Sequence, residues 1–169
     1  LISHGDLAAR KVVLDCVNRA LEAADTYAGT RRVVRLENGT LYVGHKTFHL
    51  GRIKNIYVVG AGKGSFPIAR ALDEILGERI TAGLVLVKKS GPEKLECVKV
   101  LESGHPVPNE ASLAGGLEIQ RIASRVQKGD VVFVCMTGGC SALMVLPLEG
   151  ITLDDKIQVN KLLLKTGAS

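Results

Sequence analysis

The chain alternates short, almost wholly apolar stretches with segments of helical periodicity. The apolar stretches are residues 56–59, 84–87, 98–101 and 131–136. The segments with helical periodicity are residues 6–26, 64–77, 109–127 and 152–165. Strands that lack a polar side are typical of parallel sheets that are covered on both faces. The pattern therefore predicts an α/β fold with a doubly wound, mainly parallel sheet and helices on both of its faces.

Turn and cap residues refine this pattern. Asn38-Gly39 separates two short β-type runs, and both residues accept the positive φ that a tight hairpin turn requires. With a third short strand at residues 47–49, this predicts a small antiparallel hairpin elaboration beside the main sheet. The stretch 98–101 alternates polar and apolar side chains, so we expect that strand nearer an edge. The expected helix caps are Ser3 or Asp6, Asn109 and Thr152.

Length and composition indicate one globular domain and exclude several function classes. Of the 169 residues, 46% are hydrophobic and 23% are charged, which is ordinary for a single packed domain. The formal net charge of +5 suits anionic ligands. However, no run of Lys and Arg is longer than two, and paired stacking aromatics are missing, so we expect no nucleic-acid binding. The apolar runs are too short to cross a bilayer, so we expect no membrane partner.

The cysteines favour a reducing compartment. Cys16, Cys97, Cys135 and Cys140 do not form the two close pairs of a zinc site, so we expect buried free thiols and no metal bound by them. These features indicate a cytoplasmic protein. The first residue is Leu rather than Met, so a targeting segment before it, and a mitochondrial location, stay open.

The loops after the strands are the candidate site, because ligands of doubly wound sheets bind beyond the carboxyl ends of the strands. The first such loop reads Gly60-Ala61-Gly62-Lys63-Gly64-Ser65. Its glycines let the backbone approach a ligand and expose N–H groups, and the next helix adds the positive end of its dipole. With the charge of Lys63, the loop suits an anion such as phosphate. Its spacing matches neither a P-loop nor a dinucleotide fingerprint, so a tight turn with a solvated lysine is the alternative.

Two further loops end at the same edge. Prolines stiffen residues 102–109, from which Ser103 and His105 can donate to ligand oxygens. A rigid crossover with a packed or solvated His105 is the alternative. Residues 136–143 repeat the glycine turn before a helix and predict a second anion site. Its candidate ligand residues are Thr137, Gly138, Gly139 and Ser141.

Three other features near these loops have a weaker functional interpretation. Ser141 is not expected to be a nucleophile, because Leu143 stands where a nucleophile elbow needs its last glycine. Cys140 begins the short helix, where a reactive thiol is a minor alternative. Lys88-Lys89 follows the second apolar stretch; a position along the same crevice and a solvated turn are both open there, and we favour the turn.

Three segments together resemble the N-terminal half of the class II glycerate kinases, a family that includes proteins labelled hydroxypyruvate reductases. They are Val-Val-Gly-Ala-Gly-Lys at 58–63, Glu-Ser-Gly-His-Pro-Val-Pro-Asn-Glu at 102–110 and Gly-Gly-Cys-Ser-Ala-Leu at 138–143. Asp154-Asp155-Lys156 and the final Leu-Leu-Lys-Thr-Gly-Ala fit the same pattern, so the likeness covers nearly the whole chain. The family usually has a third glycine where this chain has Cys140. If that position needs positive φ, Cys140 is strained.

The resemblance implies ATP-dependent phosphorylation of D-glycerate to 2-phosphoglycerate with Mg²⁺. It implies that residues 1–169 are the Rossmann-like N-terminal domain of a longer two-domain kinase, with the active site between the domains. Lys63 is then the catalytic lysine, and the other loop residues bind substrate or phosphate. The expected partners are D-glycerate, ATP and the C-terminal domain, without which we expect no activity. A homo-oligomeric state stays open.

Two other functions remain as alternatives. A NAD(P)H-dependent hydroxypyruvate reductase shares the sheet and the glycine turn, but it needs an acidic residue at the end of the second strand to bind the ribose. That strand ends Val87-Lys88-Lys89, which argues against NAD, although a basic pair suits a 2′-phosphate. The third function is a non-catalytic anion-binding module.

Overall fold

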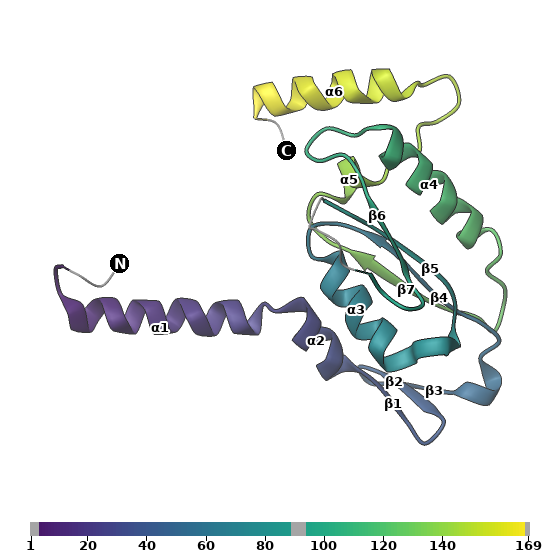
Figure 1. Ribbon diagram of the computed structural model, residues 1–169, viewed down its shortest axis with the longest axis horizontal. Coiled ribbons are helices and arrows are strands. Elements are labelled where there is room, and N and C mark those ends of the chain that lie inside the picture. Colours follow the sequence, from purple (N-terminus) through teal and green to yellow (C-terminus); the bar gives the residue numbers. More distant parts are fainter. Residues whose placement is uncertain (1–3, 89–93, 168–169) are drawn as a thin grey trace.

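A four-stranded parallel sheet forms the centre of the computed structural model, which describes residues 4–88 and 94–167 (Figure 1). Its strands, in spatial order, are β6 (Lys99–Glu102), β5 (Ile80–Val87), β4 (Ile56–Ala61) and β7 (Val131–Met136). All neighbouring pairs are parallel. The chain order of the strands therefore reverses between β4 and β7, which is where open α/β sheets bind ligands. The predicted edge position of residues 98–101 is confirmed, and β7 forms the other edge.

Helices cover both faces of the sheet, which confirms the predicted fold class. Neighbouring residues of a strand point to opposite faces. Val58 of β4 packs in one core cluster with Leu72 of α3 (Ser65–Leu76), and Val59 packs in the other with Ile122 of α4 (Glu110–Ala123). The capping box at Asn109 confirms the predicted start of α4. The helix ends at Ala123, four residues earlier than predicted.

A small antiparallel sheet lies at one side of the domain, as the hairpin signal predicts. It contains β1 (Val34–Glu37), β2 (Thr40–Val43) and β3 (Lys46–His49), followed by the 3₁₀ turn η1 (Leu50–Arg52). Asn38 and Gly39 have φ of 47° and 74°, the values that a turn of this kind requires. Leu41 is fully buried and ties this sheet to the core under α3. A second 3₁₀ turn, η2 (Gly77–Arg79), leads into β5.

The helix predicted over 6–26 is present but ends three residues earlier, and a second helix that was not predicted follows it. Asp6 caps α1 (Leu7–Ala23), whereas the alternative cap Ser3 lies outside the described residues. The Asp25 side chain accepts the N–H of Ala28 and starts α2 (Thr26–Val33), which changes the chain direction. In the described part α1 has no buried residue, and it projects from the domain (Figure 1). Cys16 is therefore exposed, which corrects the prediction of a buried thiol.

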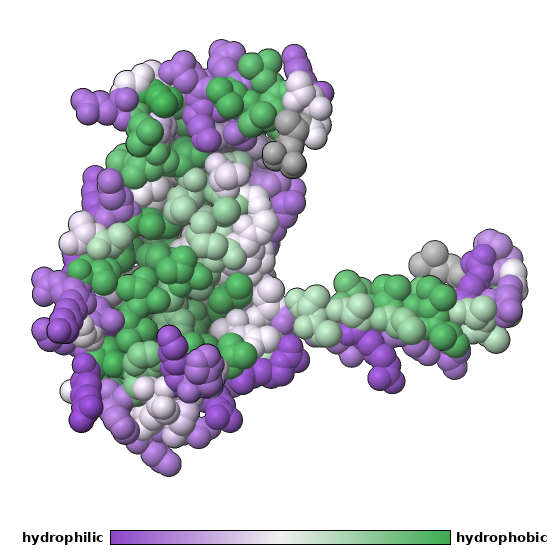
Figure 2. Space-filling model, turned by 180° about the vertical axis from the view of Figure 1, so that it is seen from behind, coloured by the Kyte–Doolittle hydropathy of each residue, from purple (hydrophilic) through white to green (hydrophobic). Residues whose placement is uncertain are grey.

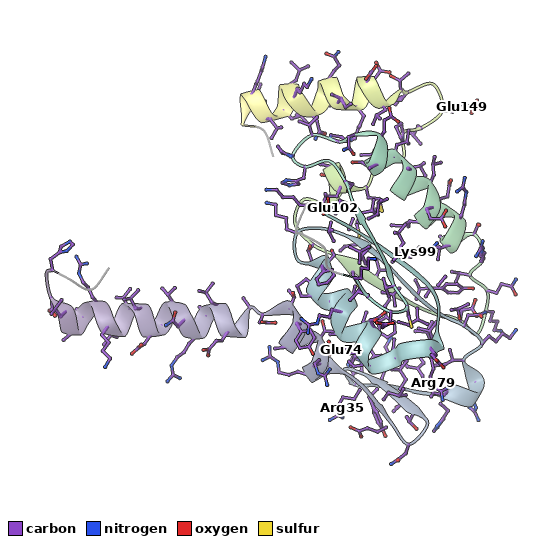
Figure 3. All side chains as sticks on the ribbon, viewed as in Figure 1. Arg35, Glu74, Arg79, Lys99, Glu102 and Glu149 are labelled. Atoms are coloured by element: carbon purple, nitrogen blue, oxygen red, sulfur yellow. The ribbon has the colours of Figure 1, made fainter. Side chains whose placement is uncertain are left out.

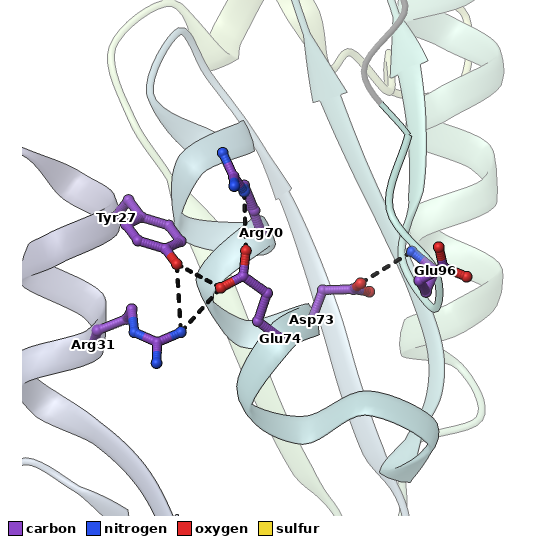
Figure 4. A network of polar contacts seen from close by, with 6 residues as sticks. All are labelled: Tyr27, Arg31, Arg70, Asp73, Glu74 and Glu96. Carbon is purple, nitrogen blue, oxygen red and sulfur yellow. Dashed lines mark hydrogen bonds and ion pairs between the residues drawn. The ribbon is translucent and has the colours of Figure 1, made fainter.

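Polar contacts fasten α2 to α3 (Figure 4). Glu74 of α3 accepts hydrogen bonds from the Tyr27 hydroxyl and from Arg31 of α2, the latter at 2.9 Å. Arg70 donates to the other carboxylate oxygen of Glu74 at 3.0 Å. The projecting helix α1 is thus joined to a well-anchored second helix.

Two helices complete the chain. The four-residue α5 (Cys140–Leu143) follows β7, and α6 (Leu153–Thr166) begins at the predicted cap Thr152. No helix within residues 4–88 and 94–167 has both the length and the apolar character that crossing a bilayer requires.

Candidate functional site

The loops after the four parallel strands are tied together at the carboxyl edge of the sheet. In Figure 3, Glu102 marks this end of β6, and Arg79 precedes β5 at the opposite edge. Four backbone N–H groups donate to carbonyl oxygens of neighbouring loops or strand ends. These bonds, of 3.0 or 3.1 Å, run from Gly62 to Leu86, from Lys63 to Gly138, from Ser103 to Val87 and from Thr137 to Ala61. The structure therefore brings the predicted loops to one place.

The N–H groups of the glycine-rich loop are bonded within the protein. Those of Gly62 and Lys63 donate to the carbonyls just named, that of Gly64 donates to Thr137 Oγ1 at 2.9 Å, and that of Ser65 donates to Gly62 O at 3.3 Å. This corrects the expectation of free amides that cradle an anion. What the loop presents to solvent is the exposed side chain of Lys63.

Two glycines of this loop allow a close approach to β7. A Cβ atom at Gly60 would lie 2.2 Å from the carbonyl oxygen of Cys135. A Cβ atom at Gly62, where φ is 144°, would lie 2.0 Å from Thr137 Oγ1. At Gly64 a Cβ atom would make only ordinary contacts, the nearest at 3.6 Å. Gly60 thus lets β4 lie close to β7, and Gly62 lets its loop lie close to Thr137, which is a structural reason for their presence.

Three predicted ligand hydroxyls hold the loops together. Ser65 is fully buried and donates to Cys135 O at 2.7 Å, so its predicted contact with a ligand is corrected. Thr137 Oγ1 accepts from the Gly64 N–H and lies 3.3 Å from Ser65 Oγ. Ser103 Oγ donates to Leu143 O at 2.8 Å and fixes the start of the His105 loop against α5.

Lys63 and His105 meet at the glycine bend after β7. A Cβ atom placed on Gly139 would lie 2.7 Å from His105 Nε2 and 3.4 Å from Lys63 Cε. Gly139 has φ of 91°, so it supplies both the turn and the space for the two side chains. A Cβ atom at Gly138 would meet no described atom within 4 Å, so this residue faces open space. Two side chains and an open backbone bend thus form the centre of the site.

The electrostatic surroundings of His105 are positive. Burial lowers the pKa of the imidazole below its ordinary 6.5, and the charges of Lys63 and Lys88 lower it further. The imidazole is therefore neutral at pH 7 and can donate one N–H without adding charge. Lys88 belongs to these surroundings, so the crevice position is correct for it and the favoured solvated turn is not. Its position directly after the second strand is the signal that indicates this. Lys89 lies outside the described residues.

Residues 140 and 141 stand at the rim of the site. Cys140 is the first residue of α5 and has no positive φ, so the strain considered for it is absent at this described residue. Ser141 is exposed and lines an open, largely apolar pocket of about 350 Å³ between α5 and α6, with Lys156 on its other side. Cys135 is buried below the site, which raises the pKa of its thiol to about 12.

Comparisons with known proteins give the family of the chain and agree with its fold. The family described as "Domain of unknown function (DUF4147)" matches residues 12–169. Glycerate 2-kinase from Pyrococcus horikoshii is 36% identical over 159 residues, which are 94% of this chain and 35% of that relative. A crystal structure of a protein from Pyrococcus horikoshii has a TM-score of 0.80 and 37% identity, covering 95% of this chain and 36% of that one. For a glycerate kinase from Thermotoga maritima the TM-score is 0.75 and the identity 26%, with 96% and 36% covered. The chain therefore spans about a third of the length of these proteins.

Proposed function

We propose a function for a chain that belongs to the DUF4147 family, as its match over residues 12–169 establishes. The chain is the N-terminal, phosphate-handling domain of an ATP-dependent glycerate kinase that transfers a phosphoryl group to the 2-hydroxyl of D-glycerate. The observation that carries this proposal is the meeting of Lys63 and His105 at Gly139, where the strand order reverses. The printed names of the glycerate kinases that match the chain support it.

The residues of this chain act by position and charge. Phosphoryl transfer depends almost entirely on orientation and on electrostatic stabilisation of the transferred group. The bond from the Lys63 N–H to Gly138 O fixes the root of the lysine beside the open bend, so its ammonium group can bind phosphate oxygens there. Neutral His105 adds an N–H donor next to Gly139, on the same side as the Lys63 side chain. Gly138 leaves room for the bound group.

The same residues do not fit a magnesium ion. Mg²⁺ takes oxygen ligands, mostly carboxylates and phosphate oxygens. The side chains at the centre of the site are Lys63 and His105, and Lys88 adds a further positive charge near them. The described residues contain no group of three or more His, Cys, Asp or Glu able to hold a metal. We therefore assign no step of the reaction to Mg²⁺ bound by this chain, and place the cationic side chains on the phosphate oxygens.

Uncovered apolar surfaces support the proposal that a second domain completes the enzyme. Val132, Val134 and Met136 point from β7 to the sheet face beside α4, and 64% of Val134 is exposed. Figure 2 shows apolar side chains gathered over the middle of the body and along α1. A parallel strand is ordinarily covered on both faces. Further polypeptide that covers β7 would lie next to the loop that holds Gly138, and we expect the 169 residues alone to be inactive.

Substitution of Lys63 in the full-length protein tests the function. With ATP, Mg²⁺ and D-glycerate, Lys63→Ala should lower turnover by about 10²–10³, as loss of one electrostatic stabiliser does. Lys128→Ala is the matched control, because Lys128 is an exposed lysine in the loop before β7. This loop lies at the amino ends of the parallel strands, away from the site. Near-normal turnover by Lys63→Ala would refute the assignment. A wild-type protein that binds NADPH and reduces hydroxypyruvate, without phosphorylating D-glycerate, would replace it with the reductase.

A further inference from the structure

Lys88 occupies a central position among the loops of the site. It directly follows β5, the strand between β4 and β6. The last two carbonyls of β5 accept the N–H groups of Gly62 and Ser103, so the end of this strand lies between the Lys63 loop and the His105 loop. Leu84 and Leu86 point toward α4. Lys88 is the first residue after this strand, and its side chain is exposed at the same end of the sheet as the Lys63 loop and the His105 loop.

Neither Lys63 nor Lys88 forms an ion pair within the described part of the protein. The ion pairs among the described residues involve Arg31, Arg35, Arg70 and Arg121. Both ammonium groups lie near enough to His105 to oppose its protonation. Two cations that face one imidazole repel each other, and an anion between them relieves that repulsion.

We propose that Lys88 is a ligand-binding residue of this site, and that Lys63 and Lys88 hold one group with several anionic oxygens from two sides while His105 donates to it. The inference rests on the proposed function and adds to it a second cation, on a third loop. The ligand class is a phosphoryl group or the carboxylate of a small hydroxy acid, since both present several anionic oxygens. Lys63, Lys88 and His105 would contact the anionic oxygens of a phosphoryl group and of a carboxylate in the same way.

Histidine NMR of the full-length protein tests this inference without relying on turnover. The His105 signals are assigned by their loss in His105→Gln, and inorganic phosphate and D-glycerate are then titrated in separate samples. We expect a saturable shift with at least one of these probes. Lys88→Gln and Lys63→Gln should each weaken its binding about tenfold, the effect expected from one charge-assisted contact. Lys128→Gln should leave it within about twofold of wild type.

The outcomes separate the two probes and the two proposals. A shift with phosphate alone assigns a phosphoryl group to the subsite, and a shift with D-glycerate alone assigns a carboxylate. No shift with either probe, or unchanged binding by Lys88→Gln, overturns the role of Lys88. If Lys88→Gln weakens phosphate binding but the wild-type protein does not phosphorylate D-glycerate, the subsite stands and the kinase function fails. If the kinase is active and Lys88→Gln keeps wild-type KM and binding, the kinase stands and the subsite fails.

Discussion

The buried carboxylate of Asp73 holds the segment that leads into β6 and then to the His105 loop. It lies on α3, is 7% exposed and accepts three backbone hydrogen bonds, one of which Figure 4 shows. The donors are the N–H groups of Glu96 (3.0 Å), Cys97 (2.9 Å) and Val98 (2.9 Å). One side chain thus supplies the acceptors for three successive peptide groups that lie outside regular structure, and its removal should be costly.

The expected loss follows from those three bonds. In Asp73→Ala the N–H of buried Val98 loses its acceptor, which costs about 1–3 kcal/mol. The other two N–H groups lie nearer the surface, where water replaces part of the bond, and each loses about 0.5–1.5 kcal/mol. We expect the free energy of unfolding to fall by about 4 kcal/mol. Asp73→Asn keeps the oxygen that serves Cys97 and Val98, so it should cost only about 1–2 kcal/mol.

Urea unfolding followed by circular dichroism measures these differences. Asp15→Ala is the control, because Asp15 is exposed in the middle of α1, and it should change the free energy of unfolding by less than about 0.5 kcal/mol. The reasoning is refuted if Asp73→Ala loses less than about 1 kcal/mol, or if Asp73→Asn is as destabilised as Asp73→Ala.

Two further predictions concern the loops of the site. Gly60→Ala should lower the free energy of unfolding by about 3 kcal/mol, because its Cβ would press on the Cys135 carbonyl, whereas Gly138→Ala should melt like wild type and bind phosphate more weakly. Equal melting temperatures for both variants would contradict this. NMR titration should give His105 a pKa below 6.5, and a higher one in Lys88→Gln. The unfolded chain then binds more protons than the folded one between the folded pKa and 6.5, so the free energy of unfolding rises with pH across that window and falls on acidification. A pKa at or above 6.5 in wild type would be the contrary result.

The sequence predicts which residues gather at the site better than it predicts what they do there. Parallel strands deliver their trailing loops to one edge, so Lys63, His105 and Gly139 could be expected to meet once the strands were identified. The hydrogen-bond partners of the loop could not be expected, because the Gly64 N–H finds its acceptor on Thr137, more than seventy residues away. Ser65 resembles a ligand residue in the motif, yet it is buried by the same packing.

For the fold too, the local sequence predicts the elements but not which other segments cover them. Apolar residues 131–136 indicate a strand buried on both faces, and β7 is an edge strand with one side exposed. Periodicity reports which environment a side chain suits, but not which other segment provides it. The helix α2 was not predicted for a different reason. Its eight residues contain few apolar side chains, and the Asp25 cap is the main local signal of its start.

The N–H groups of the loop from Gly62 to Ser65 are bonded within the protein, so a bound anion depends on the lysine side chains. Ligand binding should therefore be sensitive to salt concentration. An anion held by buried backbone N–H groups is little affected by dissolved salt. Lys63 and Lys88 instead carry their charges on exposed side chains, which salt ions screen. At 0.15 M ionic strength the Debye length is about 8 Å, similar to the reach of such a side chain. Ligand affinity at this edge should therefore decline steadily as potassium chloride is added, and the electrolyte of the cell would set its working value.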